Sequence, residues 1–146
     1  MTRVIPMALA AATLASPVFA DNHASGDPAE GEQVFRQCRA CHMIVDDDGN
    51  NIQRGGRVGP NLYGVVGRTA GSVEGFNYSD LIVTAGEQGL AWDEESFAAY
   101  VQDPTGYLQE TTGESGRGKM SYMVRSEEDA LNVWAYLASV GPEPES

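Results

Sequence analysis

The 146-residue sequence has few of the residues that most often carry chemistry: two cysteines, two histidines and a single lysine, Lys119. Acidic residues outnumber basic ones by 21 to 9, and the formal charge of −12 argues against a nucleic-acid partner. The sequence also lacks an apolar run of the roughly 20 residues that a membrane-spanning helix needs, so stable membrane insertion is not expected. Convincing apolar–polar alternation is scarce, which favours a mainly helical fold over a β-sheet fold.

The N-terminal segment has the form of a secretory signal peptide. Arg3 precedes a short apolar run, Val4–Ala15, and the small residue Ala20 ends the segment. We therefore expect residues 1–20 to be removed by cleavage after Ala20 and the mature protein to lie in the periplasm. Residues 21–146 are enough for one domain. Without Arg3, 8 basic residues remain against 21 acidic ones, a formal charge of −13.

Both cysteines fall in one motif, Cys38, Cys41 and His42, with two residues between the thiols and the histidine directly after the second. This C-x-x-C-H spacing is typical of the attachment of a c-type haem. Two thiols at this spacing can reach the two vinyl groups of a porphyrin, and the next imidazole can bind the iron. A thioredoxin-like motif would need a βαβ context, and a zinc site needs four ligands, for which His23 is the only further histidine.

Two helices are predicted near the ends of the mature chain. Asp27, followed by a proline, is a typical helix start. Glycine inside a helix costs about 1 kcal/mol relative to alanine, so Gly31 indicates close approach of another helix. Ser126 begins a second helix with one apolar stripe, and Gly141 ends it. We predict that these N- and C-terminal helices cross, with Gly31 facing residues 133–137.

Two shorter helices are predicted in the middle of the chain. One runs from Ser79 to Ala85 and ends at Gly86, and the other opens at residues 92–95 and stops before Pro104. The polar stretch 43–57 and the stretch after Tyr107 are predicted to be loops. The buried face of the second of these helices is predicted to hold Phe97, Tyr100 and Val101.

A low-spin haem needs a second axial ligand on the side opposite His42. His23 falls in the N-terminal stub, and Met43 adjoins His42 and cannot reach the opposite side. Met120 and Met123 lie in the glycine-containing loop after Tyr107, which could fold over the ring. One of the two is expected to be a packing residue, but spacing alone does not choose between them.

The chain resembles the class I cytochromes c, especially the bacterial cytochrome c2 and c550 type, which is close to mitochondrial cytochrome c. The resemblance implies an all-α cytochrome c fold of four to five helices around one covalently bound haem c, and a monomer. It covers nearly all of the mature chain and is carried by residues 31–35, 38–42, 59–68, 75–80, Trp92, residues 103–104, 119–122 and 134–137.

The resemblance also implies roles for single residues. The family's iron-binding methionine follows a lysine, so Lys119 implies Met120 as the ligand opposite His42, with Met123 as the packing residue. The carbonyl of Pro60 would accept the remaining imidazole proton of His42, which makes the ligand more basic.

Four further residues match positions around the haem in this family. Arg68, Tyr78 and Trp92 match positions that hold a haem propionate, since a buried carboxylate requires charged or hydrogen-bonding partners. Tyr100 matches a tyrosine near the methionine sulfur. For the three aromatic residues, an ordinary place in the core is compatible with these roles.

His/Met ligation leaves no open iron position for a substrate, so the resemblance implies a one-electron carrier and not an enzyme. The implied partners are a cytochrome bc1 complex as donor and a photosynthetic reaction centre or terminal oxidase as acceptor. Two alternatives remain. The chain could be the haem subunit of a periplasmic redox enzyme complex, or a high-spin gas-binding or peroxidase-like cytochrome in which Met120 is displaced.

The sequence departs from this family at its basic residues. Relatives commonly dock through a ring of lysines around the haem edge, whereas this chain has only Lys119. Acidic residues gather in runs at 46–48, 93–95 and 127–129. We therefore expect a weakly positive front on a strongly negative molecule. The arginines that could rebuild part of the basic ring are Arg36, Arg39, Arg54, Arg57, Arg68, Arg117 and Arg125, of which Arg68 is expected to be occupied inside the protein.

Overall fold

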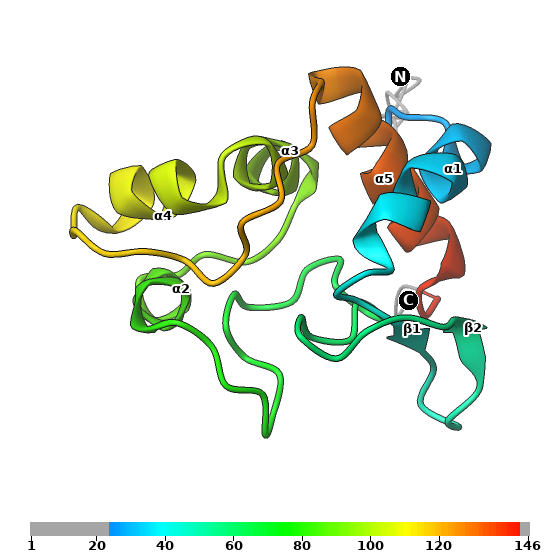
Figure 1. The fold of residues 1–146 in the computed structure, drawn as a ribbon, viewed down its shortest axis with the longest axis horizontal. Coiled ribbons are helices and arrows are strands. Elements are labelled where there is room, and N and C mark those ends of the chain that lie inside the picture. Colours follow the sequence, from blue (N-terminus) through cyan, green and yellow to red (C-terminus); the bar gives the residue numbers. More distant parts are fainter. Residues whose placement is uncertain (1–23, 144–146) are drawn as a thin grey trace, which may run out of the picture.

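A computed structural model describes residues 24–143, so the predicted signal peptide over residues 1–20, its cleavage site after Ala20, and His23 lie outside the described residues. Figure 1 shows α1 and α5 packed together on one side and α2, α3 and α4 on the other. The elements are α1 (Pro28–Cys38), β1 (Ile44–Val45), β2 (Asn51–Gln53), α2 (Asp80–Glu87), α3 (Glu94–Gln102), α4 (Pro104–Thr112) and α5 (Glu127–Val140). The prediction of a mainly helical fold with four to five helices is confirmed.

The predicted crossing of the terminal helices is confirmed, because α1 and α5 make the most extensive contact between any two elements. Gly31 is buried at this crossing, where a β-carbon would collide with the carbonyl oxygen of Asn132 and lie 2.8 Å from Cβ of Tyr136. The contact therefore begins one residue before the predicted region 133–137. Asp27 caps α1 as predicted, and its backbone N–H donates to Oδ1 of the buried Asn132 at 2.8 Å.

Aromatic pairs tie the helices into one core. The rings of Phe35 in α1 and Tyr136 in α5 lie 5.6 Å apart, and those of Phe97 in α3 and Trp134 in α5 lie 5.1 Å apart. A smaller cluster between α2 and α4 consists of Leu81, Ala85 and Leu108. No helix within residues 24–143 combines the length and the apolar character that a membrane crossing requires.

The predicted end of α2 at Gly86 is wrong. The helix was predicted to run from Ser79 to Ala85, but Ser79 is its N-cap and α2 runs from Asp80 to Glu87. Gly86 is buried inside the helix, and a β-carbon there would collide with the carbonyl oxygen of Ala70. This glycine therefore serves a close contact between α2 and the neighbouring loop, and not the end of the helix.

The loop predicted after Tyr107 is also partly wrong, because α4 continues to Thr112. Asp103 caps this helix by accepting from the N–H of Gly106, and a proline follows at the first helical position. Gly113 ends the helix in the left-handed conformation, with φ of 73°. Asp103 and Pro104 therefore end α3, as predicted, and at the same time begin α4.

The stretch 43–57 was predicted to be a loop but contains a short hairpin, in which β1 and β2 pair antiparallel with Ile44 opposite Gln53. Asp46 forms the turn between the strands, where its carboxylate accepts from the N–H groups of Asp48 and Asn50 at 3.0 and 2.8 Å. Ile44 is fully buried, which anchors this hairpin to the core directly after the C-x-x-C-H motif.

Candidate haem site

A largely apolar cavity lies between the helices and the loops that connect them. Its walls come from α1, α2, α3, α5 and the loops that precede α2 and α5. The segment after α1 and the loop before α5 approach it from different sides (Figure 1). The structure brings all of the predicted site residues to this one cavity: Cys38, Cys41, His42, Pro60, Arg68, Tyr78, Trp92, Tyr100 and Met120.

The end of α1 positions the histidine. The N–H of His42 donates to the carbonyl of Cys38 at 2.8 Å, which closes a tight turn after the helix. Nδ1 of His42 lies 2.8 Å from the carbonyl oxygen of Pro60. Because a carbonyl only accepts, Nδ1 carries the proton and Nε2 keeps its lone pair. Burial lowers the pKa of His42 below 6.5, which the Pro60 bond opposes and the charge of Arg68 reinforces, so a neutral imidazole is favoured at neutral pH.

The two cysteines are free thiols, both partly buried and both on the cavity wall with His42. Burial raises the pKa of Cys38 to about 11, so this group is a thiol and not a thiolate at neutral pH. A pair of thiols and an imidazole on one wall is the arrangement that thioether attachment and iron ligation require.

Glycines after the hairpin hold the motif in place, a contribution that sequence reasoning missed. The N–H of Gly56 donates to the carbonyl of Arg39 at 2.9 Å, and the N–H of Gly59 donates to that of Cys41 at 2.8 Å. A β-carbon on Gly59 would collide with the imidazole of His42. The signal was available as a cluster of glycines shortly after the motif, but it indicated only a loop.

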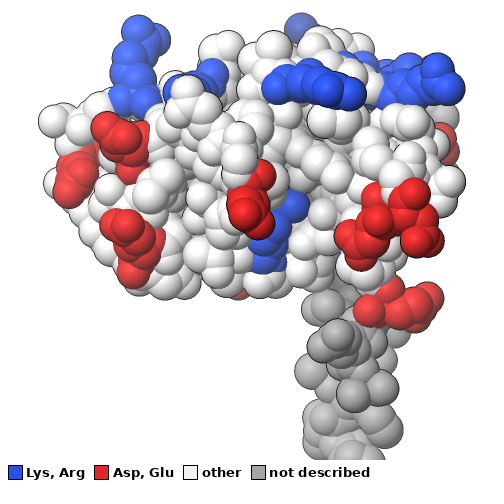
Figure 2. Space-filling view, turned by 90° about the horizontal axis from the view of Figure 1, so that it is seen from below, with Lys and Arg blue, Asp and Glu red and all other residues white. Residues whose placement is uncertain are grey.

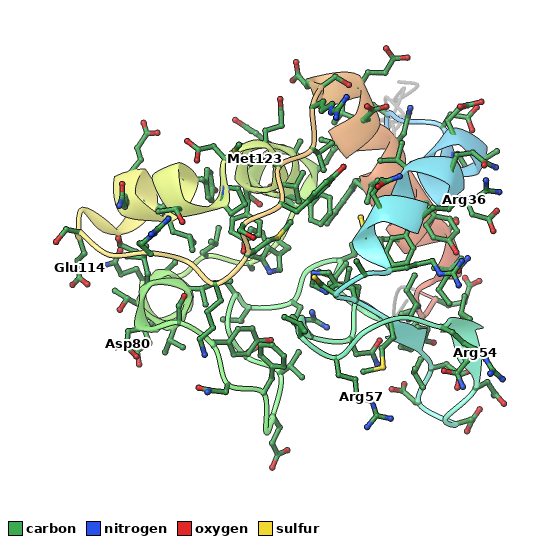
Figure 3. The ribbon with its side chains drawn as sticks, in the orientation of Figure 1. Arg36, Arg54, Arg57, Asp80, Glu114 and Met123 are labelled. Carbon is green, nitrogen blue, oxygen red and sulfur yellow. The ribbon has the colours of Figure 1, made fainter. Side chains whose placement is uncertain are left out.

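The two candidate methionines have different surroundings. Met120 is partly buried and lines the cavity, whereas the side chain of Met123 is 56% exposed (Figure 3). The expected packing role of Met123 is therefore wrong. Val124, 5% exposed, fills the core instead, and its N–H donates to the carbonyl of Val101 at 2.8 Å, which turns the neighbouring Met123 outward.

Two side chains anchor the loop just before Met120. Oγ1 of Thr105 in α4 accepts from the N–H of Gly118 at 3.1 Å. Nζ of Lys119 donates to the carbonyl of Asn77 at 2.7 Å and so joins this loop to the one before α2. These two hydrogen bonds hold Gly118 and Lys119, the two residues directly before Met120, in place.

Two basic residues line the cavity within the described residues, Arg68 and Lys119. Lys119 is exposed, so the partly buried Arg68 supplies the positive charge on the inner wall. Its Nη1 donates to the carbonyls of Asn61 and Tyr63 at 3.1 and 3.3 Å. Burial lowers the pKa of this guanidinium. A guanidinium has five N–H donors, so Arg68 retains donors for a carboxylate inside the cavity.

Aromatic side chains complete the wall. The rings of Trp92 and Tyr100 lie 4.8 Å apart, and burial raises the pKa of Tyr100 to about 12. The hydroxyl of Tyr78 accepts from the N–H of Val73 at 3.2 Å. Two thiols, an unprotonated Nε2, a thioether, apolar walls and one guanidinium together fit the donor set and shape of a haem c.

No family model matches the chain. The chain is 55% identical to the cytochrome c2 of Rhodovulum adriaticum over 123 residues, which are 83% of this chain and 98% of that protein. It is 47% identical to the cytochrome c-551 of Roseobacter denitrificans over 141 residues, 96% of each chain.

Solved structures give the same result. The cytochrome c2 of Rhodobacter sphaeroides matches with a TM-score of 0.79 at 52% identity, over 82% of this chain and 100% of that one. The ferric cytochrome c-550 of Paracoccus versutus matches with a TM-score of 0.76 at 44% identity, over 81% and 100%.

Proposed function

Because the chain belongs to the cytochrome c2 family of class I c-type cytochromes, which carry one covalently bound haem c, we propose that it is a periplasmic one-electron carrier and not an enzyme. The resemblance inferred from the sequence and the cytochrome c fold are thereby confirmed. The observation that carries the proposal is that Cys38, Cys41, His42 and Met120 all line one apolar cavity.

In this proposal Cys38 and Cys41 would hold the haem through thioether bonds, and Nε2 of His42 and the sulfur of Met120 would bind its iron. When bound, the haem supplies a reversible one-electron couple at its iron. Pro60 keeps the proton of His42 on Nδ1, so that Nε2 stays available to the metal. Ligation by both His42 and Met120 would leave no iron position for a substrate.

The remaining predicted residues are assigned to the cofactor's edges. Arg68, Tyr78 and Trp92 would hold a propionate, and their donors compensate the burial of its charge. Tyr100 would lie near the sulfur of Met120, since both line the same cavity. The apolar walls exclude water, which keeps the reorganisation that accompanies electron transfer small.

Export is part of the same proposal. Residues 1–20 would act as the signal peptide, with cleavage after Ala20, and residues 21–146 would fold as one domain in the periplasm. Haem attachment to two free thiols suits that route. We expect the mature protein to be a monomer, as the family resemblance implies.

The proposed partners are a cytochrome bc1 complex as donor and a photosynthetic reaction centre or terminal oxidase as acceptor. Exposed residues at the cavity include Val58 (77% exposed) and Tyr122 (41% exposed), together with Lys119. An apolar contact beside basic side chains would suit brief docking of an electron-transfer partner. Arg57 directly precedes Val58 and adds a charge next to this contact.

The distribution of charge supports a weakly positive front. Most Lys and Arg side chains in Figure 2 lie along one edge, while Asp and Glu side chains occupy other parts of that view. Figure 3 shows Arg36, Arg54 and Arg57 on the side of α1 and the hairpin, whose turn also carries Asp46, whereas Asp80 and Glu114 lie at the opposite end. Such an asymmetry on an acidic protein would steer one face toward a negative partner.

The test is transient kinetics with the purified holoprotein, a cytochrome bc1 complex and either proposed acceptor. We expect reduction and reoxidation of the same molecule, with second-order rate constants that fall as ionic strength rises. Arg57→Gln should lower the rate constants at low salt, while Glu114→Gln at the other end of the molecule is the matched control. Failure to exchange electrons with any of these partners contradicts the proposed function, and rates independent of salt contradict the docking face.

The two alternatives give different results. Purification at a fixed stoichiometry with a larger periplasmic enzyme would favour a permanent haem subunit. Rapid binding of carbon monoxide or cyanide to the resting protein would favour a gas-binding or peroxidase-like site, because that binding requires an iron position that Met120 does not fill.

A further inference from the structure

The side chain of Asn61 joins the two chain segments that meet at His42. Its Nδ2 donates to the carbonyl of Val45 at 2.8 Å, and its Oδ1 accepts from the N–H of the same residue at 3.0 Å. The same Oδ1 also accepts from the N–H of Tyr63 at 3.1 Å. One amide thus pairs with both backbone groups of a residue in β1, as a neighbouring strand would.

This pairing closes a short ring of contacts around the histidine. Val45 follows His42 by three residues, and Asn61 directly follows Pro60, whose carbonyl accepts from Nδ1 of His42. The backbone from His42 to Val45, the pairing of Val45 with the Asn61 side chain, and the peptide bond from Asn61 to Pro60 therefore connect the imidazole to the carbonyl that accepts its proton. This connection fixes the imidazole of His42 relative to the carbonyl of Pro60.

Neighbouring contacts make this ring stiff. Ile44, between the motif and Val45, is fully buried, so β1 cannot move without opening the core. The N–H of Leu62 donates to the carbonyl of Met43 at 3.1 Å, a second tie between the same two segments. The side chain of Asn61 makes two hydrogen bonds between these segments. Because the tie at Leu62 is between backbone groups, Asn61 is the member of this connection that a substitution can remove.

We propose that Asn61 is a positioning residue that sets the donor strength of His42, and through it the reduction potential of the bound iron. The inference rests on the proposed ligation by His42. A firm hydrogen bond from Nδ1 to Pro60 makes the imidazole a stronger donor. A stronger donor stabilises ferric more than ferrous iron, so the intact ring lowers the potential and a loosened Pro60 carbonyl raises it.

The experiment compares holoprotein with the substitutions Asn61→Ala and Asn61→Ser by equilibrium redox titration. We expect the electron-exchange equilibrium of Asn61→Ala to shift by up to about tenfold toward the ferrous form. Loss of an outer partner typically changes metal affinity by about 10- to 100-fold, and only the difference between its effects on ferric and ferrous iron enters the redox equilibrium. For a one-electron couple a tenfold shift is about 59 mV. Asn61→Ser keeps a hydroxyl and should shift the equilibrium in the same direction by less.

The matched control is Asn51→Ala. Asn51 lies on the same hairpin, is exposed, and pairs with Val45 through its backbone, so its amide can be removed without touching Pro60. The reduction potential of the Asn51→Ala protein should equal that of the wild type. Proton NMR of the ferrous proteins gives a second readout, in which the Nδ1 proton of His42 should exchange with solvent faster in both Asn61 variants but not in the control.

Failure of this inference differs from failure of the proposed function. If His42 does not bind the iron, the wild-type spectrum is already not that of a His/Met haem, before any variant is made. If the wild-type spectrum is as expected but Asn61→Ser has the wild-type potential and the wild-type Nδ1 exchange rate, the positioning role is wrong, whether or not Asn61→Ala can be purified.

Discussion

The backbone of Gly59 packs directly against the imidazole ring of His42. A β-carbon at position 59 would collide with Cε1 and would lie 2.6 Å from Nδ1 and 2.7 Å from Nε2. The N–H of Gly59 meanwhile donates to the carbonyl of Cys41, so the glycine cannot move away without breaking a bond to the motif itself. The imidazole of His42 is therefore held between the Pro60 carbonyl at its edge and the Gly59 backbone at its face.

Substitution of Gly59 by alanine should displace the imidazole. We expect Gly59→Ala to destabilise the holoprotein by about 1–3 kcal/mol, as overpacking of a filled site does, and to lower the yield of low-spin haem protein. Gly118→Ala is the control, because a β-carbon there meets only ordinary contacts at 3.4 and 3.6 Å. Optical spectra and thermal unfolding of both variants give the answer. Equal behaviour of the two variants would contradict the close contact at His42.

If Met120 binds the iron as proposed, Thr105 should control how readily it dissociates. Thr105→Val removes the acceptor for the N–H of Gly118, and loss of one such bond weakens the loop by about 1 kcal/mol. Cyanide binding to the ferric protein, which requires displacement of the methionine, should then be faster by about fivefold. Thr105→Ser keeps the hydroxyl and should bind cyanide at the wild-type rate. A faster rate in the serine variant as well would argue against this hydrogen bond.

Gly31 should be intolerant of any side chain because it lies at the crossing of α1 and α5. Helix propensity alone would make Gly31→Ala stabilising by about 1 kcal/mol. The collision with the carbonyl of Asn132 should outweigh that gain and lower the free energy of unfolding. Gln33→Ala, at an exposed position of the same helix, tests propensity without the collision. If denaturant unfolding shows Gly31→Ala to be the more stable protein, the crossing is looser than described.

The cap of α3 should make stability depend on pH in the acid range. Hydrogen bonds from the side chain and backbone of Ser96 hold the pKa of Asp93 below 3.8. Since the folded-state pKa is the lower one, the carboxylate's contribution is complete above about pH 3.8 and is lost as the pH falls through the folded-state value.

Asp93→Ala should therefore cost about 1 kcal/mol near neutral pH, as loss of an N-cap does. The difference in melting temperature between wild type and variant should shrink as the pH falls below 3.8. Thermal unfolding followed by circular dichroism at several pH values measures it. A difference that stays constant down to the most acidic condition would show that the charge of Asp93 contributes nothing to the cap.

Local chemistry was enough to predict the ends of several helices and the crossing of two of them. Asp27 and Ser126 cap their helices as expected, because capping depends on neighbours within the same turn. Gly31 indicated a close approach, and the structure provides it at Asn132. The convergence of the site residues on one cavity followed from the family resemblance and not from spacing.

The errors have physical reasons. Asp103 and Pro104 repeat the start signal of α1, but the proline was interpreted only as the end of α3. Gly86 was interpreted as a helix end, although its conformation is helical and its role is a contact with Ala70. In both cases the local signal was ambiguous and the neighbouring element decided it.

Contacts between distant segments were the least accessible to sequence reasoning. Met123 was expected to pack, but Val124 takes the core position because its backbone bonds to Val101 in α3. The amide of Asn61 pairs with Val45 across a separation of 16 residues, and nothing in either local sequence indicates the pair.

The central claim, ligation of the haem iron by His42 and Met120, is tested most directly by the optical spectra of the oxidised and reduced holoprotein. Wild type should be low-spin in both states and show the methionine–ferric-iron charge-transfer band. Met120→Ala should lose that band, and Met123→Ala, at the exposed methionine three residues later, should keep it. A high-spin wild-type spectrum, or a band that survives in Met120→Ala, would contradict the account.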